Sequence, residues 1–412
     1  MMETTRHDLQ PGWHYDEDTG AIMRDVIHRM GRRCFRWDYC GKGTYMITMT
    51  LTDRSKSLFG RLVGVSAETA AIELSELGRA VDAHLRRISE FTPEIELLGA
   101  QLMPEHLHAV LRVKRRMAKP LGFALRGFKG GASQLFWRLT PPEETRRRHG
   151  ERTDAERRPL FAEGYVDNIL GDEQAIEGAI RYLADNPRRL WEKRAHPELF
   201  KVLREVRVRL GVGTPSEPSG DFSPDAIAPA VPTAGSFSAI GNLALLDAPN
   251  VFQVQCSRSF FEYRRAPDGS LLKDAPPAVE TREFIEKRDG FLEAAEHGAV
   301  LLSPCISHGE REIARLAFEK GLKVITLANK GFNPLYKPGG RLFDQCAGGN
   351  LLMLAPVAWP YVPGEKKMTR VDACVLNRIG QWLSGAGAVE IKYRGAEPSQ
   401  VNSLARAALK AE

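Results

Sequence analysis

The chain has 412 residues, of which 43% are hydrophobic and 27% charged, and its formal net charge is +6. This length predicts two domains, each large enough to bury its own core, and the composition is typical of globular proteins. No apolar run is long enough to span a membrane, and the first residues lack the apolar core of a signal peptide. We therefore expect a cytoplasmic protein with no membrane partner.

The basic residues and the cysteines indicate what the chain could bind and in which state its thiols are expected. Lys and Arg exceed Asp and Glu mainly within residues 101–210, which favours either a polyanionic partner for this segment or a solvated basic surface. The six cysteines include no Cys-x-x-Cys pair, so we expect reduced and mostly buried thiols. Cys34 and Cys40 would make half of a zinc site, but no second pair of ligands follows them.

The first half of the chain predicts an α+β domain. Residues 1–40 are irregular and are expected to form an N-terminal arm, and residues 41–210 alternate between strand and helix periodicities. Strand, helix, strand, strand and helix make up most of a ferredoxin-like fold. The expected elements are a strand over 45–52, a helix over 67–91, strands over 95–103 and 106–113, a helix over 121–139 interrupted at Gly130 and Gly131, and a helix that begins at Asp172 and ends at Pro187.

The second half of the chain has a different pattern. Residues 211–236 are rich in Pro, Gly, Ser and Ala and lack periodicity, which predicts a flexible linker. Residues 237–412 then alternate short apolar strands with helices, which predicts an α/β domain with a parallel, doubly wound sheet.

Two histidines lie in the strand expected over 106–113, which should be central in its sheet. Residues two apart in a strand point to the same face, so His106 and His108 should present their imidazoles together while Leu107 faces the core. Two convergent imidazoles suit a divalent metal. The alternative is a pair of strand histidines that hydrogen-bond to the backbone or to solvent.

A tyrosine and an asparagine in the helix after Asp172 are further candidates. Tyr182 and Asn186 are four residues apart and share one helical face, which would lie over the sheet. A phenol, with an ordinary pKa of about 10, attacks a phosphodiester poorly unless a metal or base assists it. Two imidazoles and an amide oxygen leave open positions suited to Mg²⁺ or Mn²⁺. The alternatives are a packing role for Tyr182 and a helix-capping role for Asn186.

Three segments in this order resemble the single-tyrosine transposases of the HUH nuclease superfamily, in particular the REP-associated tyrosine transposases. The segments are Met-Pro-Glu-His-Leu-His-Ala-Val-Leu at 103–111, Gly-Tyr-Val-Asp-Asn-Ile-Leu at 164–170 and Tyr-Leu-Ala-Asp-Asn-Pro at 182–187. The resemblance covers roughly residues 40–205. Glu105 stands where the family usually has Asn, and the large C-terminal domain is not part of the usual single-domain transposase.

The resemblance implies a mechanism and a fold. His106 and His108 would bind the metal, Asn186 would complete its site, and Tyr182 would attack single-stranded DNA, leaving a 5′-phosphotyrosine and a free 3′-hydroxyl. The bond energy is conserved, so the reverse reaction can rejoin strands. The fold would be a ferredoxin-like HUH nuclease domain over residues 41–210.

The expected partner is single-stranded or hairpin DNA, held by phosphate-binding cations and by aromatic side chains. The aromatic candidates are Phe128, Phe136 and Trp137. For any one of these residues, a solvated charge or a core aromatic is the alternative. The basic candidates are Lys114, Arg115, Arg116, Lys119, Arg126, Lys129, Arg181, Arg188 and Arg189.

The C-terminal domain has a candidate phosphate site of its own. A strand end runs into a helix start near 303–312, where Ser303, Ser307 and Gly309 could hold a phosphate. Residues 298–356 are similar to the Rossmann-like core of the DNA-processing protein A and lysine-decarboxylase-like group. No convincing Gly-x-Gly-x-x-Gly is present, so no dinucleotide site is predicted, and a structural or partner-binding domain is the alternative.

Together these features predict a DNA transposase or endonuclease that cuts and rejoins single-stranded DNA with Mg²⁺ or Mn²⁺. One alternative is a DNA-binding regulator that no longer cleaves. Another is a nucleotide-processing enzyme centred on the C-terminal domain. Whether the chain works as a monomer or a homodimer is left open.

Overall fold

The structure is a computed structural model, and it forms two compact units, Met1–Trp191 and Glu192–Glu412. The division lies inside helix α5 (Glu173–Ala195), upstream of the linker predicted at 211–236. The last residues of the predicted linker, 234–236, belong to a strand. Residues 211–231 of the linker lie outside the described residues, as do Cys34 and most of the predicted N-terminal arm. The structure describes residues 13–15, 22–24, 37–145, 157–210, 232–256, 261–262, 279–364, 366–385 and 398–410.

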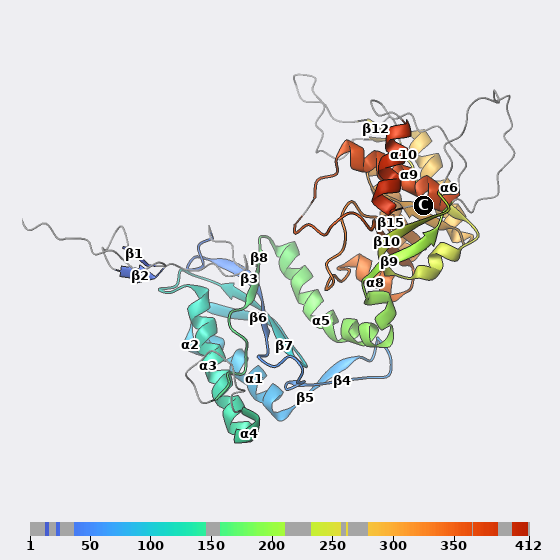
Figure 1. Cartoon of the computed structure of the whole chain (residues 1–412). Helices are drawn as coiled ribbons and strands as arrows, with labels where there is room; N and C mark the ends of the chain where they lie inside the picture. The colour runs from blue at the N-terminus through green and yellow to red at the C-terminus, as the bar shows by residue number, and fades with distance from the viewer. Residues whose placement is uncertain are drawn as a thin grey trace, which may run out of the picture. The chain divides into compact units, whose positions relative to one another are not determined.

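The N-terminal unit is built on a four-stranded antiparallel sheet of order β6-β7-β3-β8 (Figure 1). Helix α1 connects β3 to β6 and helix α3 connects β7 to β8, which is the ferredoxin-like arrangement that the sequence predicted, with β8 as its fourth strand. The bounds are β3 Gly43–Thr50, α1 Glu76–Arg86, β6 Ile95–Met103, β7 His106–Val113, α3 Leu121–Leu139 and β8 Val166–Leu170.

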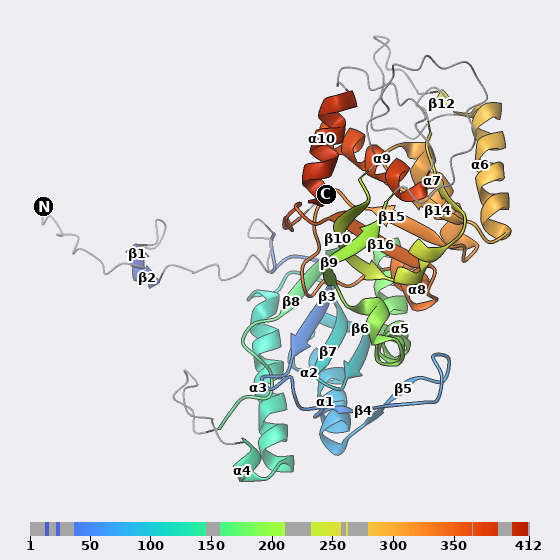
Figure 2. The ribbon, with the colours of Figure 1, turned by 45° about the vertical axis from the view of Figure 1, so that its right-hand side comes forward.

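The two faces of the sheet have different partners (Figure 2). Leu107, Ala109 and Leu111 of β7 are fully buried against the layer formed by α1 and α3. Val110 points the other way and packs against Ala179 and Leu183 of α5. The period of two along β7 therefore places His106 and His108 on the face that α5 covers.

A glycine on edge strand β6 also faces α5. A Cβ added at Gly99 would lie 3.4 Å from Cδ1 of Leu183 and 3.9 Å from Cγ1 of Ile180. The pairing of β6 with β7 shifts register between Leu97 and Gly99. The missing side chain therefore lets the helix lie close to the sheet.

Helix α3 runs without a break through Gly130 and Gly131, so the predicted interruption is wrong. A Cβ at Gly131 would lie only 2.3 Å from Nε2 of His84, whereas a Cβ at Gly130 would meet nothing within 4 Å. The absence of a side chain at Gly131 thus allows α1 and α3 to pack closely. His84 also stacks on Phe128, with ring centroids 5.2 Å apart.

Helix α5 continues through Pro187 to Ala195, so the predicted end at Pro187 is wrong. Proline has no N–H to donate to the carbonyl of Leu183, but its neighbours keep the helix in place. Leu183 and Pro187 are both buried, and Asn186 Nδ2 donates to the carbonyl of Tyr182 over 2.8 Å. Burial of this stretch outweighs the local cost of the proline.

The remaining short elements of the N-terminal unit include a hairpin of β4 and β5 between β3 and α1. The hairpin is anchored where Phe59 donates its N–H to the carbonyl of Pro104, next to the turn before β7. The bounds are β1 Trp13–Tyr15, β2 Ile22–Arg24, β4 Gly60–Val63, β5 Ala71–Leu74, α2 Ile88–Phe91 and α4 Pro142–Thr145.

The C-terminal unit has a six-stranded sheet of order β11-β14-β15-β16-β10-β9. The first four strands are parallel, and β10 is antiparallel to both β16 and β9. The strand bounds are β9 Leu203–Arg209, β10 Ala234–Gly241, β11 Val251–Gln253, β14 Val300–Ser303, β15 Val324–Leu327 and β16 Leu351–Pro356, with a separate pair β12 Phe261–Glu262 and β13 Val279–Glu280.

Helices cover both faces of this sheet, as predicted, but the sheet is not doubly wound. Its four parallel strands lie side by side in chain order, so the winding direction does not reverse among them. Helices α6 and α7 pack on the face that includes Leu301, and α9 and α10 on the face that includes Leu302. The bounds are η1 Pro197–Phe200, η2 Leu243–Asp247, α6 Arg282–Glu296, α7 His308–Glu319, α8 Arg341–Ala347, α9 Arg370–Ser384 and α10 Pro398–Leu409.

Within the described ranges, no helix is both long and apolar enough to cross a bilayer.

Candidate active site

The two histidines of β7 point their Nε2 atoms at each other. The Nε2 atoms of His106 and His108 are 3.1 Å apart, within hydrogen-bond distance of each other, and the rings are nearly perpendicular, at 80°. His108 is 7% exposed, and His106 is half-buried. The predicted convergence of the two imidazoles is thus present in the geometry.

The other nitrogen of each ring has a polar neighbour. Nδ1 of His108 lies 2.8 Å from Oγ1 of Thr48, the residue opposite it on β3. Nδ1 of His106 lies 3.4 Å from a carboxylate oxygen of Glu105. An Nδ1–H that donates to such an acceptor leaves the lone pair on Nε2. Sequence reasoning gave no role to Thr48 or Glu105, because only the pairing of β3 with β7 and the geometry of the turn reveal these contacts.

The spacing of the Nε2 atoms fits a shared divalent metal. Two ligands that each lie about 2.1 Å from a metal, at a right angle, are about 3.0 Å apart. Among the residues that the structure describes, no group of three or more His, Cys, Asp and Glu side chains could hold an ion. Asn186, the predicted third ligand, is an amide and so is not among the residue types of that group.

Helix α5 places Tyr182 beside this pair. The ring centroids of Tyr182 and His108 are 5.7 Å apart, with the planes at 71°. Asn186 lies one turn further along and is 7% exposed. Since its Nδ2 donates to the helix backbone, its amide oxygen is the end that can accept or coordinate. The predicted capping role for Asn186 is wrong, because the helix continues beyond it.

Three charged residues of α5 form a cluster, and one of them lies over the tyrosine ring. Asp185 accepts hydrogen bonds from Nε of Arg188 at 2.5 Å and from Nε of Arg189 at 2.7 Å. Burial acts to raise the pKa of Asp185, but the hydrogen bonds and charges of the two arginines outweigh it and leave that pKa below its ordinary value. The guanidinium carbon of Arg189 lies 5.3 Å from the ring centroid of Tyr182.

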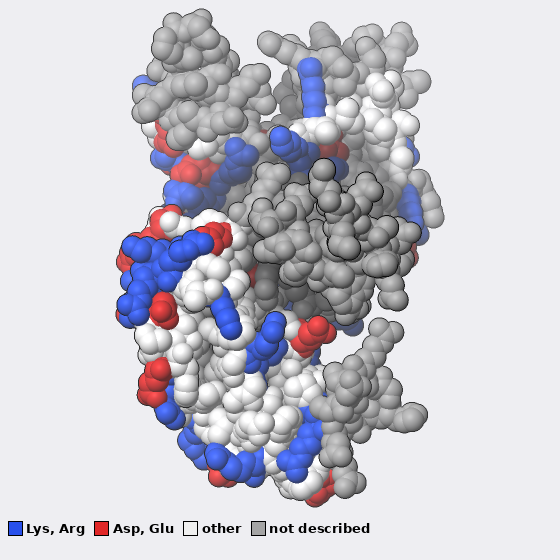
Figure 3. Space-filling model, turned by 90° about the vertical axis from the view of Figure 1, so that its left-hand side faces the viewer, with Lys and Arg blue, Asp and Glu red and all other residues white. Residues whose placement is uncertain are grey.

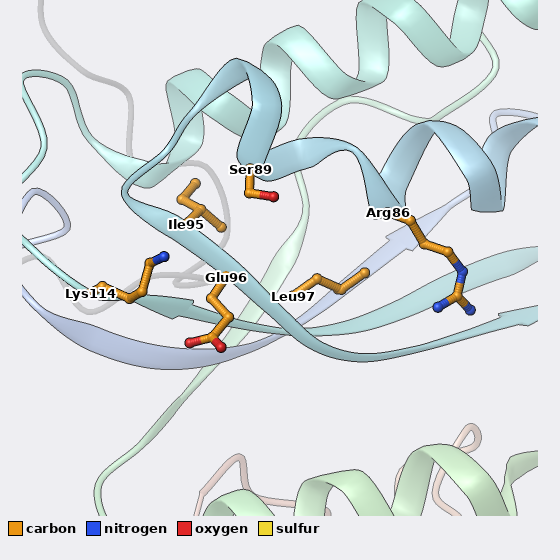
Figure 4. Close-up of a pocket in the computed structure, with 6 residues that line it drawn as sticks. All are labelled: Arg86, Ser89, Ile95, Glu96, Leu97 and Lys114. Atoms are coloured by element: carbon orange, nitrogen blue, oxygen red, sulfur yellow. The ribbon is translucent and has the colours of Figure 1, made fainter.

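The basic residues after β7 lie at the other end of the sheet from the histidines. At about 3.3 Å per residue, Lys114 is about 25 Å along the strand from His106. Arg115 pairs with Glu94 at 3.6 Å, and Arg116 with Asp38 at 2.6 Å. Lys114 lines a pocket of about 290 Å³ beside the edge strand (Figure 4), together with Arg86, Ser89, Ile95, Glu96 and Leu97.

The other predicted DNA contacts are dispersed. Lys119 stacks over Phe123 at 4.0 Å, and Arg126 is exposed on α3. Lys129 donates to the carbonyls of Ala162 and Gly164, so it ties a loop to α3. Arg181 pairs with Glu177 and is 70% exposed. On the face drawn in Figure 3, Lys and Arg side chains are interspersed with Asp and Glu.

The predicted aromatic platforms are mostly core residues. Phe128 and Phe136 are 5% and 2% exposed in the core under α3, so their predicted stacking on DNA is wrong. Trp137 packs on the same core and donates Nε1–H to the carbonyl of Arg158. Their spacing along α3 matches its buried face, which the sequence alone did not distinguish from an exposed one. Phe91 and Phe123 are exposed instead.

The donors of the C-terminal candidate site are bonded within the protein. Ser307 caps α7 by accepting from the N–H of Glu310, and the Glu310 carboxylate accepts from the N–H groups of Ile306 and Ser307. Ser303 Oγ accepts from the N–H of Cys305. Burial raises the pKa of Glu310, although these N–H groups oppose the shift. The hydroxyls of Ser303 and Ser307 and the N–H groups of Ile306 and Ser307 thus already take part in hydrogen bonds around the start of α7.

The N-terminal unit is therefore defined by a ferredoxin-like sheet with a His-x-His pair that meets a tyrosine from a covering helix. No protein-family model matches the chain. An uncharacterized protein of Haemophilus influenzae is 25% identical over 173 residues, 41% of this chain and 92% of the relative.

Two solved structures are also similar to this chain, and each covers 38% of it. One is a REP-associated tyrosine transposase bound to a REP hairpin, with a TM-score of 0.26 and 13% identity over 72% of that chain. The other is a Deinococcus radiodurans protein assigned as a transposase, with a TM-score of 0.23 and 16% identity over 96% of that chain.

Proposed function

We propose that the N-terminal unit is a metal-dependent transesterase that cleaves and rejoins single-stranded DNA through Tyr182. The observation that carries the proposal is the contact of the Tyr182 ring with His108, one of two imidazoles whose Nε2 atoms converge. The substrate class follows from the resemblance of these segments to single-tyrosine transposases. A hairpin with a single-stranded flank is the natural first substrate.

The metal would be held by the Nε2 atoms of His106 and His108, with Asn186 as an amide ligand. Bound Mg²⁺ or Mn²⁺ would polarise a phosphate oxygen and hold the scissile bond in line with its attacker. Thr48 and Glu105 would orient the imidazoles through their Nδ1 atoms.

The chemistry exchanges one ester for another. Oη of Tyr182 forms a bond to phosphorus, and the bond from phosphorus to the 3′ oxygen breaks. The proton that leaves the phenol is balanced, through solvent, by the proton that the 3′ oxygen gains. The products are a 5′-phosphotyrosine and a 3′-hydroxyl, and attack by a 3′-hydroxyl on the phosphotyrosine reverses the step.

The test is to incubate the full chain with labelled hairpin DNA and Mn²⁺ and to search for a shifted species that survives denaturant. We expect this adduct with the wild type, and we expect none with Tyr182→Phe or without metal. Tyr361→Phe, an exposed tyrosine of the C-terminal unit, is the matched control and should behave as wild type. DNA binding without any adduct would favour the non-cleaving regulator instead.

A further inference from the structure

Arg189 lies over the ring of the proposed nucleophile, and it is not placed like a surface DNA contact. Its guanidinium carbon lies 5.3 Å from the ring centroid of Tyr182, two helical turns earlier. Its side chain is only 12% exposed, against 70% for Arg181 on the same helix. Most of its surface is therefore covered before any substrate arrives.

A carboxylate on the same helix also holds the guanidinium of Arg189 in place. Its Nε donates to Oδ2 of Asp185 over 2.7 Å, one turn earlier on α5. The same carboxylate receives two hydrogen bonds from Arg188, at 2.5 and 3.0 Å. A carboxylate that accepts from two arginines is a rigid support, and the guanidinium that it holds lies over the aromatic ring of Tyr182.

We propose that Arg189 is a positioning residue that holds the phenol of Tyr182 beside the histidine pair, with Asp185 as its support. This inference rests on the proposed function. It replaces the role of Arg189 as a DNA phosphate contact with a role inside the protein. The ring of Tyr182 then has two fixed neighbours, Arg189 and His108, so its hydroxyl is presented in one orientation.

The two roles predict different kinetics. A phosphate contact contributes to DNA affinity and to its salt dependence, by a slope of about 0.7 per contact on single strands. A positioning residue leaves both unchanged and alters the rate of the chemical step, because a small displacement of the attacking atom costs up to about a hundredfold. The partition between affinity and rate therefore identifies the role.

The experiment uses the full chain and its variants Arg189→Met, Arg189→Lys and Asp185→Asn. Arg87→Met is the matched control, because Arg87 also lies over an aromatic ring, that of Phe91 at 5.6 Å, and is not among the predicted DNA contacts. Affinity for the hairpin DNA is measured without metal at several salt concentrations. Adduct formation is measured in single turnover with Mn²⁺ at saturating DNA. Arg189→Met should slow adduct formation about ten- to a hundredfold and leave affinity within about twofold.

The remaining variants sharpen the result. Arg189→Lys keeps the charge but loses the planar fork, so it should recover only part of the rate. Asp185→Asn should slow adduct formation less than Arg189→Met does. The double variant should be as slow as Arg189→Met alone, because Asp185 acts on Tyr182 only through Arg189. Arg87→Met should keep the wild-type rate.

A spectroscopic readout makes the inference independent of turnover. In protein with ¹³C-labelled tyrosine rings, the Tyr182 resonance is identified by its loss in Tyr182→Phe. It should move in Arg189→Met and stay in place in Arg87→Met. An unmoved resonance, or a loss of affinity and salt slope at an unchanged rate, would overturn the inference and leave the proposed function standing. A wild type that forms no adduct would overturn both.

Discussion

The two candidate sites differ in how their polar atoms are used. In the N-terminal unit, the Nε2 atoms of His106 and His108 face each other, while their Nδ1 atoms have neighbours that fix the rings. In the C-terminal unit, the carboxylate of Glu310 accepts from the N–H groups of Ile306 and Ser307, just before α7. Both segments carry polar residues suited to binding. Only the first has its binding atoms directed toward a shared point, so the direction of the atoms matters more than the residue types.

The largest expected effect tests whether the histidines and the tyrosine of the N-terminal site come from one chain. Tyr182 contacts His108 inside a single compact unit. An equimolar mixture of His108→Ala and Tyr182→Phe proteins should therefore form no adduct with hairpin DNA, as each should fail alone. Recovery of a substantial part of the wild-type yield would mean that a second copy supplies the tyrosine.

A large effect on stability is expected on the side of the sheet away from the site. Gly131→Ala places a methyl group 2.3 Å from Nε2 of His84, and should destabilise the unit by about 1–3 kcal/mol through overpacking. Gly130→Ala meets nothing within 4 Å and should stabilise it by about 0.5–1 kcal/mol. Urea denaturation measures both. Equal effects would show that α1 and α3 are not in close contact.

A smaller effect tests whether the start of α7 is purely structural. Ser307 and Thr369 each form a capping box, at the starts of α7 and α9 of the same unit. Ser307→Ala and Thr369→Ala should each cost about 1 kcal/mol in denaturation experiments. Inorganic phosphate should not shift the melting temperature of the wild type. A phosphate-dependent stabilisation lost in Ser307→Ala alone would instead support the predicted phosphate site.

The smallest effect is a pH dependence from His84. Burial lowers the pKa of His84, against a partly compensating backbone hydrogen bond, so the folded state binds its proton less readily than the unfolded state. Stability should therefore fall as the pH falls through the ordinary histidine pKa of about 6.5. The decline measured by urea denaturation between neutral and acidic pH should be weaker in His84→Gln. An unchanged decline would assign the effect to other groups.

The sequence predicted the local geometry of the site well. The alternation along 106–113 placed both histidines on one face, and the helical period placed Tyr182 and Asn186 together, because both inferences depend only on neighbouring residues. The continuation of α5 through Pro187 could not be predicted, since it depends on burial against the sheet. The sequence also could not show that Arg116 pairs with Asp38, a partner far away along the chain.

The absent side chain at Gly99 has a practical consequence. A Cβ there would already be in van der Waals contact with Leu183, on the helix that carries Tyr182. The size of the side chain at position 99 therefore determines how closely α5, which carries Tyr182, can pack on the sheet. A graded series of replacements at this single position therefore offers a way to shift Tyr182 relative to the histidine pair without altering any polar group of the proposed site.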